Sequence, residues 1–109
     1  MDLDELSALC LSMPGATEGI KWEDHICFMV AEKMFCITGE WGGASLKVTP
    51  EEFEELTERD GIKPTAYMAR NKWISIERFD ALKRAEWEQY VKGSYQLIAS
   101  KLPKKVLAG

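Results

Sequence analysis

Histidine, cysteine and basic side chains are the residues of this chain whose chemistry could support a function. His25 is the only histidine, so a Ser-His-Asp or Cys-His relay would have to use it. It begins an expected strand beside Glu23 and Asp24, and an isolated histidine is more often structural than catalytic. The sequence has no glycine-rich phosphate loop, no two-histidine metal motif and no nucleophile elbow. We therefore expect no enzymatic activity and no cofactor.

Two cysteines lie in a predicted hairpin where a pair of thiols could bind zinc. If residues 31–32 form a two-residue loop, Cys27 lies opposite Cys36, and His25 shares the face of Cys27. A zinc site normally needs three or four protein ligands, so thiols that pack as small hydrophobic groups are the preferred interpretation. Cys10 also has apolar neighbours, and an odd cysteine count does not suit a disulfide framework. We predict three reduced, structural cysteines and no metal site.

Basic residues near the predicted strands could neutralise phosphates. Lys33 lies at a turn, Lys47 lies in a strand, and Arg70 and Lys72 precede a strand around Trp73. Lysine and arginine on an exposed sheet face are suited to phosphate contacts, although basic residues near strand edges also discourage aggregation. The predicted DNA-binding residues are Lys33, Lys47, Arg70 and Lys72.

The composition is that of one folded domain spanning residues 1–109. An apolar share of 46% and a charged share of 29% exclude a disordered chain. The apolar runs are far shorter than the roughly 20 residues that span a bilayer. The N-terminus is acidic and lacks the basic-then-apolar order of a signal peptide. We expect a cytoplasmic protein with no membrane partner.

The charge is divided unevenly along the chain. Residues 1–58 carry 13 acidic and 3 basic residues, whereas residues 59–109 carry 5 acidic and 11 basic residues. The net charge of −4 argues against a strong general attraction to nucleic acid. Any DNA binding should therefore be weak.

The spacing of apolar residues predicts helices near both ends of the chain. Residues 2–13 form one helix that ends at Pro14-Gly15, and residues 87–102 form a longer amphipathic helix. Thr49 and Glu52 predict a capping box at the start of a short helix that ends near residue 60. Strands are expected at 20–22, 26–30, 34–38, 44–48 and 73–76, with a loop at 63–67.

These elements predict an α+β fold, a two-layer sandwich in which N- and C-terminal helices cover one face of an antiparallel sheet. The other face should be exposed. The expected core residues are Leu6, Leu9, Phe28, Phe35, Phe53, Trp73, Trp87, Tyr95 and Ile98.

Several short motifs follow one another along essentially the whole chain. They are MPGATE at 13–18, KMF at 33–35, LK at 46–47, TPE at 49–51, GxxPxxY from 61, KW at 72–73, SY at 94–95 and LPK at 102–104. In their order and spacing the chain resembles the MmcQ/YjbR family of small bacterial proteins. The resemblance implies a frataxin-like fold and a double-wing mode in which strands and turns contact DNA. The negative net charge of this chain departs from what is expected of a DNA-binding protein.

The sequence therefore predicts a weak, non-enzymatic DNA-binding protein that uses basic residues on the sheet face and turns. One alternative is an adaptor that binds a protein partner through the acidic half or the exposed sheet face. Another is frataxin-type metal handling on an acidic surface such as the carboxylates of residues 51–58. The sequence does not decide the oligomeric state.

Overall fold

Six antiparallel strands form one sheet in the computed structural model, which describes residues 1–21, 25–38, 43–65 and 71–101. The strand order is β1-β2-β3-β4-β6-β5. The strands are β1 (Ala16–Lys21), β2 (His25–Val30), β3 (Lys33–Thr38), β4 (Ala44–Lys47), β5 (Ile62–Pro64) and β6 (Trp73–Ile76). The helices are α1 (Leu3–Leu11), α2 (Pro50–Leu56), the 3-10 helix η2 (Phe79–Ala81) and α3 (Arg84–Ala99).

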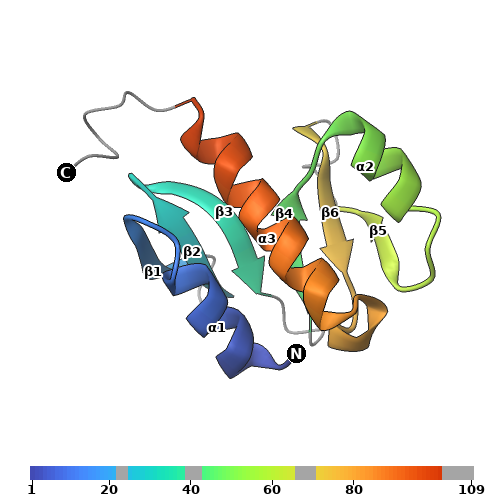
Figure 1. Cartoon of the computed structure of the whole chain (residues 1–109), viewed down its shortest axis with the longest axis horizontal. Coiled ribbons are helices and arrows are strands. Elements are labelled where there is room, and N and C mark those ends of the chain that lie inside the picture. The colour runs from blue at the N-terminus through green and yellow to red at the C-terminus, as the bar shows by residue number, and fades with distance from the viewer. Residues whose placement is uncertain (22–24, 39–42, 66–70, 102–109) are drawn as a thin grey trace.

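The helices lie on one face of the sheet, as Figure 1 shows. Helix α3 packs across β3 and β4, and α1 packs on β1 and β2. This arrangement confirms the predicted α+β sandwich with its terminal helices. The structure adds one strand to the expectation, because β5 occupies part of the expected loop, and β1 begins at Ala16 rather than Ile20.

The short helix α2 begins where its sequence signal predicts. Thr49 Oγ1 accepts a hydrogen bond from the Glu52 backbone N–H at 3.2 Å, and Glu52 Oε1 accepts one from the Thr49 N–H at 3.0 Å. This reciprocal capping box satisfies two amide groups that the first helical turn leaves without partners. It also fixes the Glu52 side chain at the start of the helix.

The turn between β2 and β3 also matches its prediction. Ala31 and Glu32 have positive φ angles of 50° and 67°, and Val30 pairs with Lys33. Positive φ at both loop residues is typical of a type I′ turn, whose twist suits a two-residue hairpin.

The predicted pairing of Cys27 with Cys36 is wrong because of a bulge. The register of β2 and β3 shifts between Phe28 and Met29, so that Cys36 pairs with Phe28 and Cys27 pairs with Ile37. A shift of one residue reverses the face on which a side chain lies. The two thiols therefore lie on opposite faces of the sheet.

The core between helices and sheet contains most of the residues expected there. The buried members of the expected set are Leu6, Phe28, Phe35, Trp87 and Tyr95, and those partly buried against them are Leu9, Phe53 and Ile98. Trp73 is the exception. Its side chain is only 6% exposed. However, Ile74 and Ile76 of the same strand belong to this core, and Trp73 lies an odd number of residues from both. Trp73 therefore faces the opposite side of the sheet.

That opposite face is not open at its centre, contrary to expectation. Cys27, Ile37 and Ser45 lie there with exposed fractions of 0%, 3% and 1%. The hydroxyl oxygens of Ser45 and Ser75 share a hydrogen bond of 3.0 Å, and Ser75 shares another of 3.0 Å with Thr65. Two apolar side chains and mutually bonded hydroxyl groups can be buried at little cost.

A serine of α3 joins the two central strands where their direct pairing ends. The last paired residues of β3 and β4 at this end are Cys36 and Leu46. Beyond them, the Lys47 backbone N–H donates to Ser94 Oγ at 3.0 Å, and Ser94 Oγ donates to the Phe35 carbonyl at 2.6 Å. The serine is 1% exposed. Its hydroxyl thus takes the place of a strand-to-strand hydrogen bond.

An arginine–glutamate pair ties the end of α2 to the start of α3. Arg59 donates to both oxygens of the Glu86 carboxylate, at 2.7 and 3.2 Å. The Lys83 backbone N–H donates to the same carboxylate at 2.9 Å. The Arg59 guanidinium, and after it the Lys83 N–H, lowers the pKa of Glu86 to about 2. Both partners favour the ionised form.

Replacing Ser94 with alanine should destabilise the fold. The Ser94→Ala change leaves the Lys47 N–H and the Phe35 carbonyl without their partner, and each unsatisfied buried group costs about 1–3 kcal/mol. We expect a loss of about 2–4 kcal/mol in the free energy of unfolding, measured by urea titration. Ser100→Ala is the control, because its hydroxyl is exposed and bonds only within its own helix. Equal stability of the two variants would contradict the bridging role.

The Glu86 pair predicts a pH dependence with a definite sign. A carboxylate whose pKa is lowered in the folded state stabilises the protein above its unfolded pKa of about 4.3, and this contribution disappears as the pH falls through about 2. The thermal midpoints of the native protein and Glu86→Gln should therefore differ at pH 7 and converge between pH 4.3 and 2. The difference at pH 7 should correspond to only about 1 kcal/mol, because Arg59 is 38% exposed. A difference independent of pH would exclude this assignment.

Candidate nucleic-acid interface

Four basic side chains have carboxylate partners. Their ion pairs are Arg59–Glu86, Lys63–Glu77, Arg78 with Asp60 and Asp80, and Arg84 with Glu5 and Glu88. A carboxylate at hydrogen-bond distance offsets the positive charge that a phosphate would otherwise meet. The charges of four of the eleven basic residues after residue 58 are therefore offset by carboxylates of the same chain.

A second group of basic side chains has no such partner. Within residues 1–21, 25–38, 43–65 and 71–101, no ion pair involves Lys33, Lys47, Lys72 or Lys101. Three of these lysines were predicted from the sequence. Lys101 was not.

Lys33 and Lys101 lie at the same hollow of the surface. The hollow has a volume of about 310 Å³ and is lined by these two lysines with Met34 and Ile98 between the hairpin turn and the end of α3. Both lysines are exposed, whereas Met34 and Ile98 are half-buried. The site therefore combines an apolar floor with two ammonium groups.

Lys47 lies close to the same group of charges. Its Nζ donates a hydrogen bond to the Asn71 carbonyl. Burial, and then the positive charge of Lys101, lowers the pKa of Lys47. Because Lys101 lies near both other lysines, we call Lys33, Lys47 and Lys101 the lysine end of the molecule.

Lys72 has a different environment. Its backbone has a φ of 63°, and its Nζ lies 4.9 Å from the centre of the Phe53 ring on α2. This cation–π contact holds the ammonium group against α2. Arg70, the fourth predicted residue, lies outside the described residues.

The sequence contained only a weak signal for Lys101. A lysine just after a helix interacts favourably with the negative end of the helix dipole, so its usual interpretation is structural. Its spacing offers a better clue, because Ser94, Ile98 and Lys101 follow one another at intervals of four and three residues. That spacing puts Lys101 on the side of α3 that meets the hairpin.

The residues considered for metal binding do not come together. Among the residues that the structure describes, no group of three or more His, Cys, Asp or Glu side chains could hold a metal ion. Cys36 instead forms a hydrogen bond with Cys10, which together with burial raises the pKa of the Cys36 thiol. His25 Nδ1 forms a 3.0 Å hydrogen bond with the Thr38 carbonyl oxygen.

Among the residues that the structure describes, no helix has the length and apolar character needed to cross a membrane.

The comparisons with known proteins agree with this architecture. The YjbR family profile matches residues 11–97. The chain belongs to the YjbR family. No curated protein matches it.

Two crystal structures share the YjbR fold of this chain. A Deinococcus radiodurans protein with a DUF419 domain is 24% identical, with a TM-score of 0.85 over 95% of this chain and 83% of its own. A Pseudomonas syringae protein is 20% identical, with a TM-score of 0.72 over 89% of this chain and 98% of its own. At these identities the likeness concerns the fold.

The three cysteines predict a clear chemical behaviour. All three thiols are buried and none forms a disulfide, and thiolate is the form that reacts. Native protein at pH 8 should react with a disulfide reagent far more slowly than unfolded protein, in which three thiols should be titrated. A chelator should leave the thermal midpoint unchanged, because no structural metal would be lost. Rapid labelling of the native protein, or a fall of several degrees with chelator, would contradict the structural role of the thiols.

Proposed function

We propose that this protein is a non-enzymatic, cytoplasmic domain that binds DNA weakly through phosphate contacts at the lysine end. The family resemblance suggests DNA as the ligand. Lys33 and Lys47 keep the role predicted from the sequence, and Lys101 joins them. Lys72 is a weaker candidate because its ammonium group contacts Phe53.

The observation that carries this proposal is a group of neighbouring lysines without a carboxylate partner among the described residues. Lys33 and Lys101 share one hollow, and the pKa of Lys47 is lowered by burial and by the charge of Lys101. Like charges close together destabilise the charged forms, and an anion between them reverses that effect. A phosphate group would therefore stabilise this arrangement, and lysine binds phosphate as a point charge.

The surroundings favour weak binding without sequence preference. The chain has a net charge of −4, which opposes the long-range approach of DNA. The floor of the hollow, Met34 and Ile98, is apolar and can contact sugars or unstacked bases but offers no hydrogen bonds for reading them. Unrelated sequences should therefore bind with similar affinity.

The salt dependence of binding tests the proposal. The protein is titrated into a fluorescently labelled short DNA duplex, and separately into its single strand, and anisotropy gives the binding constant. The titration starts at low salt and is repeated at increasing salt concentrations. Three phosphate contacts predict a slope of about −3 in log–log form for duplex and about −2 for single-stranded DNA. Lys33→Gln and Lys101→Gln should each weaken binding several-fold and reduce the slope by about 1.

Lys92→Gln provides the matched control. Lys92 is an exposed lysine of α3 that does not line the hollow. It carries the same charge as Lys33 and Lys101. Its removal should have little effect. If all three variants weaken binding equally, or if binding does not saturate at tens of micromolar protein, the lysine end is not a DNA site.

A further inference from the structure

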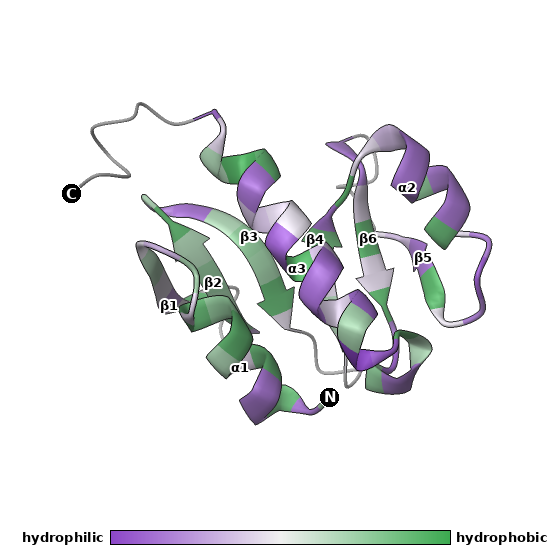
Figure 2. Cartoon of the chain, viewed as in Figure 1, coloured by the Kyte–Doolittle hydropathy of each residue, from purple (hydrophilic) through white to green (hydrophobic). Residues whose placement is uncertain are grey.

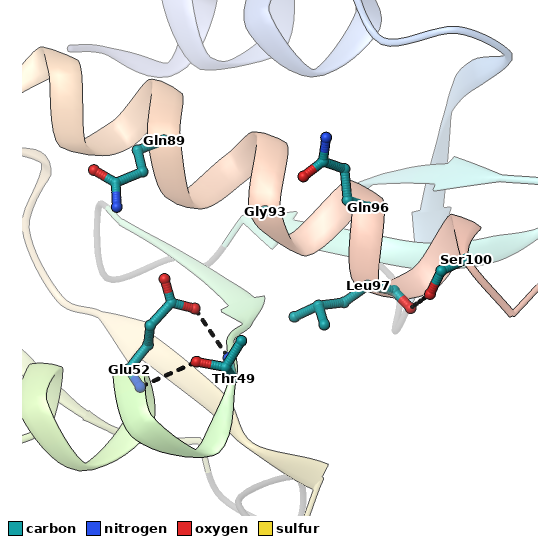
Figure 3. Close-up of a pocket in the computed structure, with 7 residues that line it drawn as sticks. All are labelled: Thr49, Glu52, Gln89, Gly93, Gln96, Leu97 and Ser100. Atoms are coloured by element: carbon teal, nitrogen blue, oxygen red, sulfur yellow. Dashed lines mark hydrogen bonds between the residues drawn. The ribbon is translucent and has the colours of Figure 1, made fainter.

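The start of α2 and the outer side of α3 enclose a groove of about 500 Å³ (Figure 3). Thr49 and Glu52 lie on the α2 side. Gln89, Gly93 and Leu97 lie on the α3 side, spaced four residues apart along one face of the helix. The groove therefore has a carboxylate, a carboxamide and an apolar side chain facing one space.

Gly93 is the unusual residue of this groove. It lies inside α3, where glycine is less favourable than alanine. A Cβ atom added at Gly93 would meet no other atom within 4 Å, so no neighbour in the fold requires glycine there. Its missing side chain leaves the backbone of α3 accessible from the groove. A ligand that approaches the helix closely would explain a residue that the fold itself does not need.

Glu52 and Gln89 point toward one another across the groove (Figure 3). Glu52 Oε1 accepts the Thr49 N–H, which holds the carboxylate in place. No hydrogen bond joins Glu52 to Gln89. A group that fills the space between them must offer hydrogen-bond donors to the carboxylate and can donate to, or accept from, the carboxamide.

The surrounding charge determines which ligand is favoured. Helix α2 is mostly hydrophilic (Figure 2) and carries Glu51, Glu52, Glu54 and Glu55 with no basic residue. Burial, and after it the charges of Glu52 and Glu55, raises the pKa of Tyr90 on α3. Negative potential therefore extends from α2 toward the facing helix. It disfavours a phosphate and favours a cation.

We propose that the groove between α2 and α3 binds an arginine side chain of a partner protein. In Figure 3 the amide nitrogen of Gln89 is turned toward Glu52 and its carbonyl oxygen is turned away. The planar guanidinium group has five N–H donors, so it can bind the Glu52 carboxylate along one edge and, after rotation of the exposed Gln89 amide, the Gln89 carbonyl along another. Its aliphatic stem would lie over Gly93 and against Leu97, the apolar part of the groove. A lysine ammonium is a compact point charge and does not span two facing groups as a planar fork does. This site is separate from the lysine end and independent of DNA binding.

The experiment compares two peptides that differ by one group. Acetyl-Gly-Arg-Gly-amide is titrated into 15N-labelled full-length protein and followed by NMR. The citrulline peptide, which has nearly the same shape but no charge, serves as its control. We expect the arginine peptide to shift the side-chain NH2 signals of Gln89 and the backbone signal of Gly93, and the citrulline peptide to bind at least tenfold more weakly. Equal binding of the two peptides would overturn the proposal.

Two variants separate binding from folding. Gly93→Ala should raise the thermal midpoint by about 4 °C, because alanine favours helix, and should weaken arginine-peptide binding at least fivefold. Glu52→Gln keeps a side chain that can complete the capping box but removes the charge, and should also weaken binding at least fivefold. Glu51→Gln, on the same helix but outside the groove, should bind as the native protein does. Unchanged binding in Gly93→Ala and Glu52→Gln would show that the groove is not the site.

A cross-test distinguishes this site from the proposed DNA site. Lys33→Gln and Lys101→Gln should leave arginine-peptide binding unchanged, and Gly93→Ala should leave DNA binding unchanged. If duplex or single-stranded DNA shifts the Gln89 and Gly93 signals and displaces the peptide, the groove belongs to the nucleic-acid interface and the arginine proposal is wrong.

Discussion

The hydroxyl group of Ser94 is the contact on which the arrangement of sheet and helix depends. Strands β3 and β4 diverge after Cys36 and Leu46, and the serine satisfies one backbone group on each. Because these partners belong to different strands, the contact fixes the position of α3 along the sheet as well as its distance from it. The Trp87 Nε1–H bond to the Phe79 carbonyl, at 2.8 Å, holds the other half of the helix. Both proposed sites are defined by where α3 lies.

Local signals in the sequence predicted the parts of the fold that local chemistry determines. The capping box of Thr49 and Glu52 depends on neighbouring residues alone. The turn at 31–32 was inferred from the strands on either side of it, since alanine and glutamate do not favour the positive φ angles found there. The face of Trp73 was predicted wrongly because a large aromatic residue suits either side of a strand that is buried on both faces. The bulge beside Phe28 was missed because a register shift depends on how two strands pair and not on the sequence of either one.

The candidate DNA site could be predicted only in part, for the same reason. Lys33 and Lys47 were identified as basic residues at a turn and in a strand, which are local properties. The role proposed for Lys101 depends on the end of α3 meeting a hairpin that lies far away in the sequence. Whether a basic residue is available to a ligand also depends on its carboxylate partner in the fold. Composition therefore overstates the positive charge that the second half of the chain offers to DNA.

Folding turns the uneven charge distribution along the sequence into two local surfaces, one with lysines and one with a glutamate. Arg59, Arg78 and Arg84 of the second half are paired with carboxylates, and the pair of Arg84 with Glu5 of α1 offsets part of the asymmetry. What is left is local: Lys33 and Lys101 at the hollow beside the end of α3, and Glu52 of α2 facing the middle of the same helix. Screening in physiological salt limits the reach of each group to about 8 Å, so neither cancels the other's effect on a ligand in direct contact. The proposed anion site and the proposed cation site can therefore lie beside different parts of the same helix.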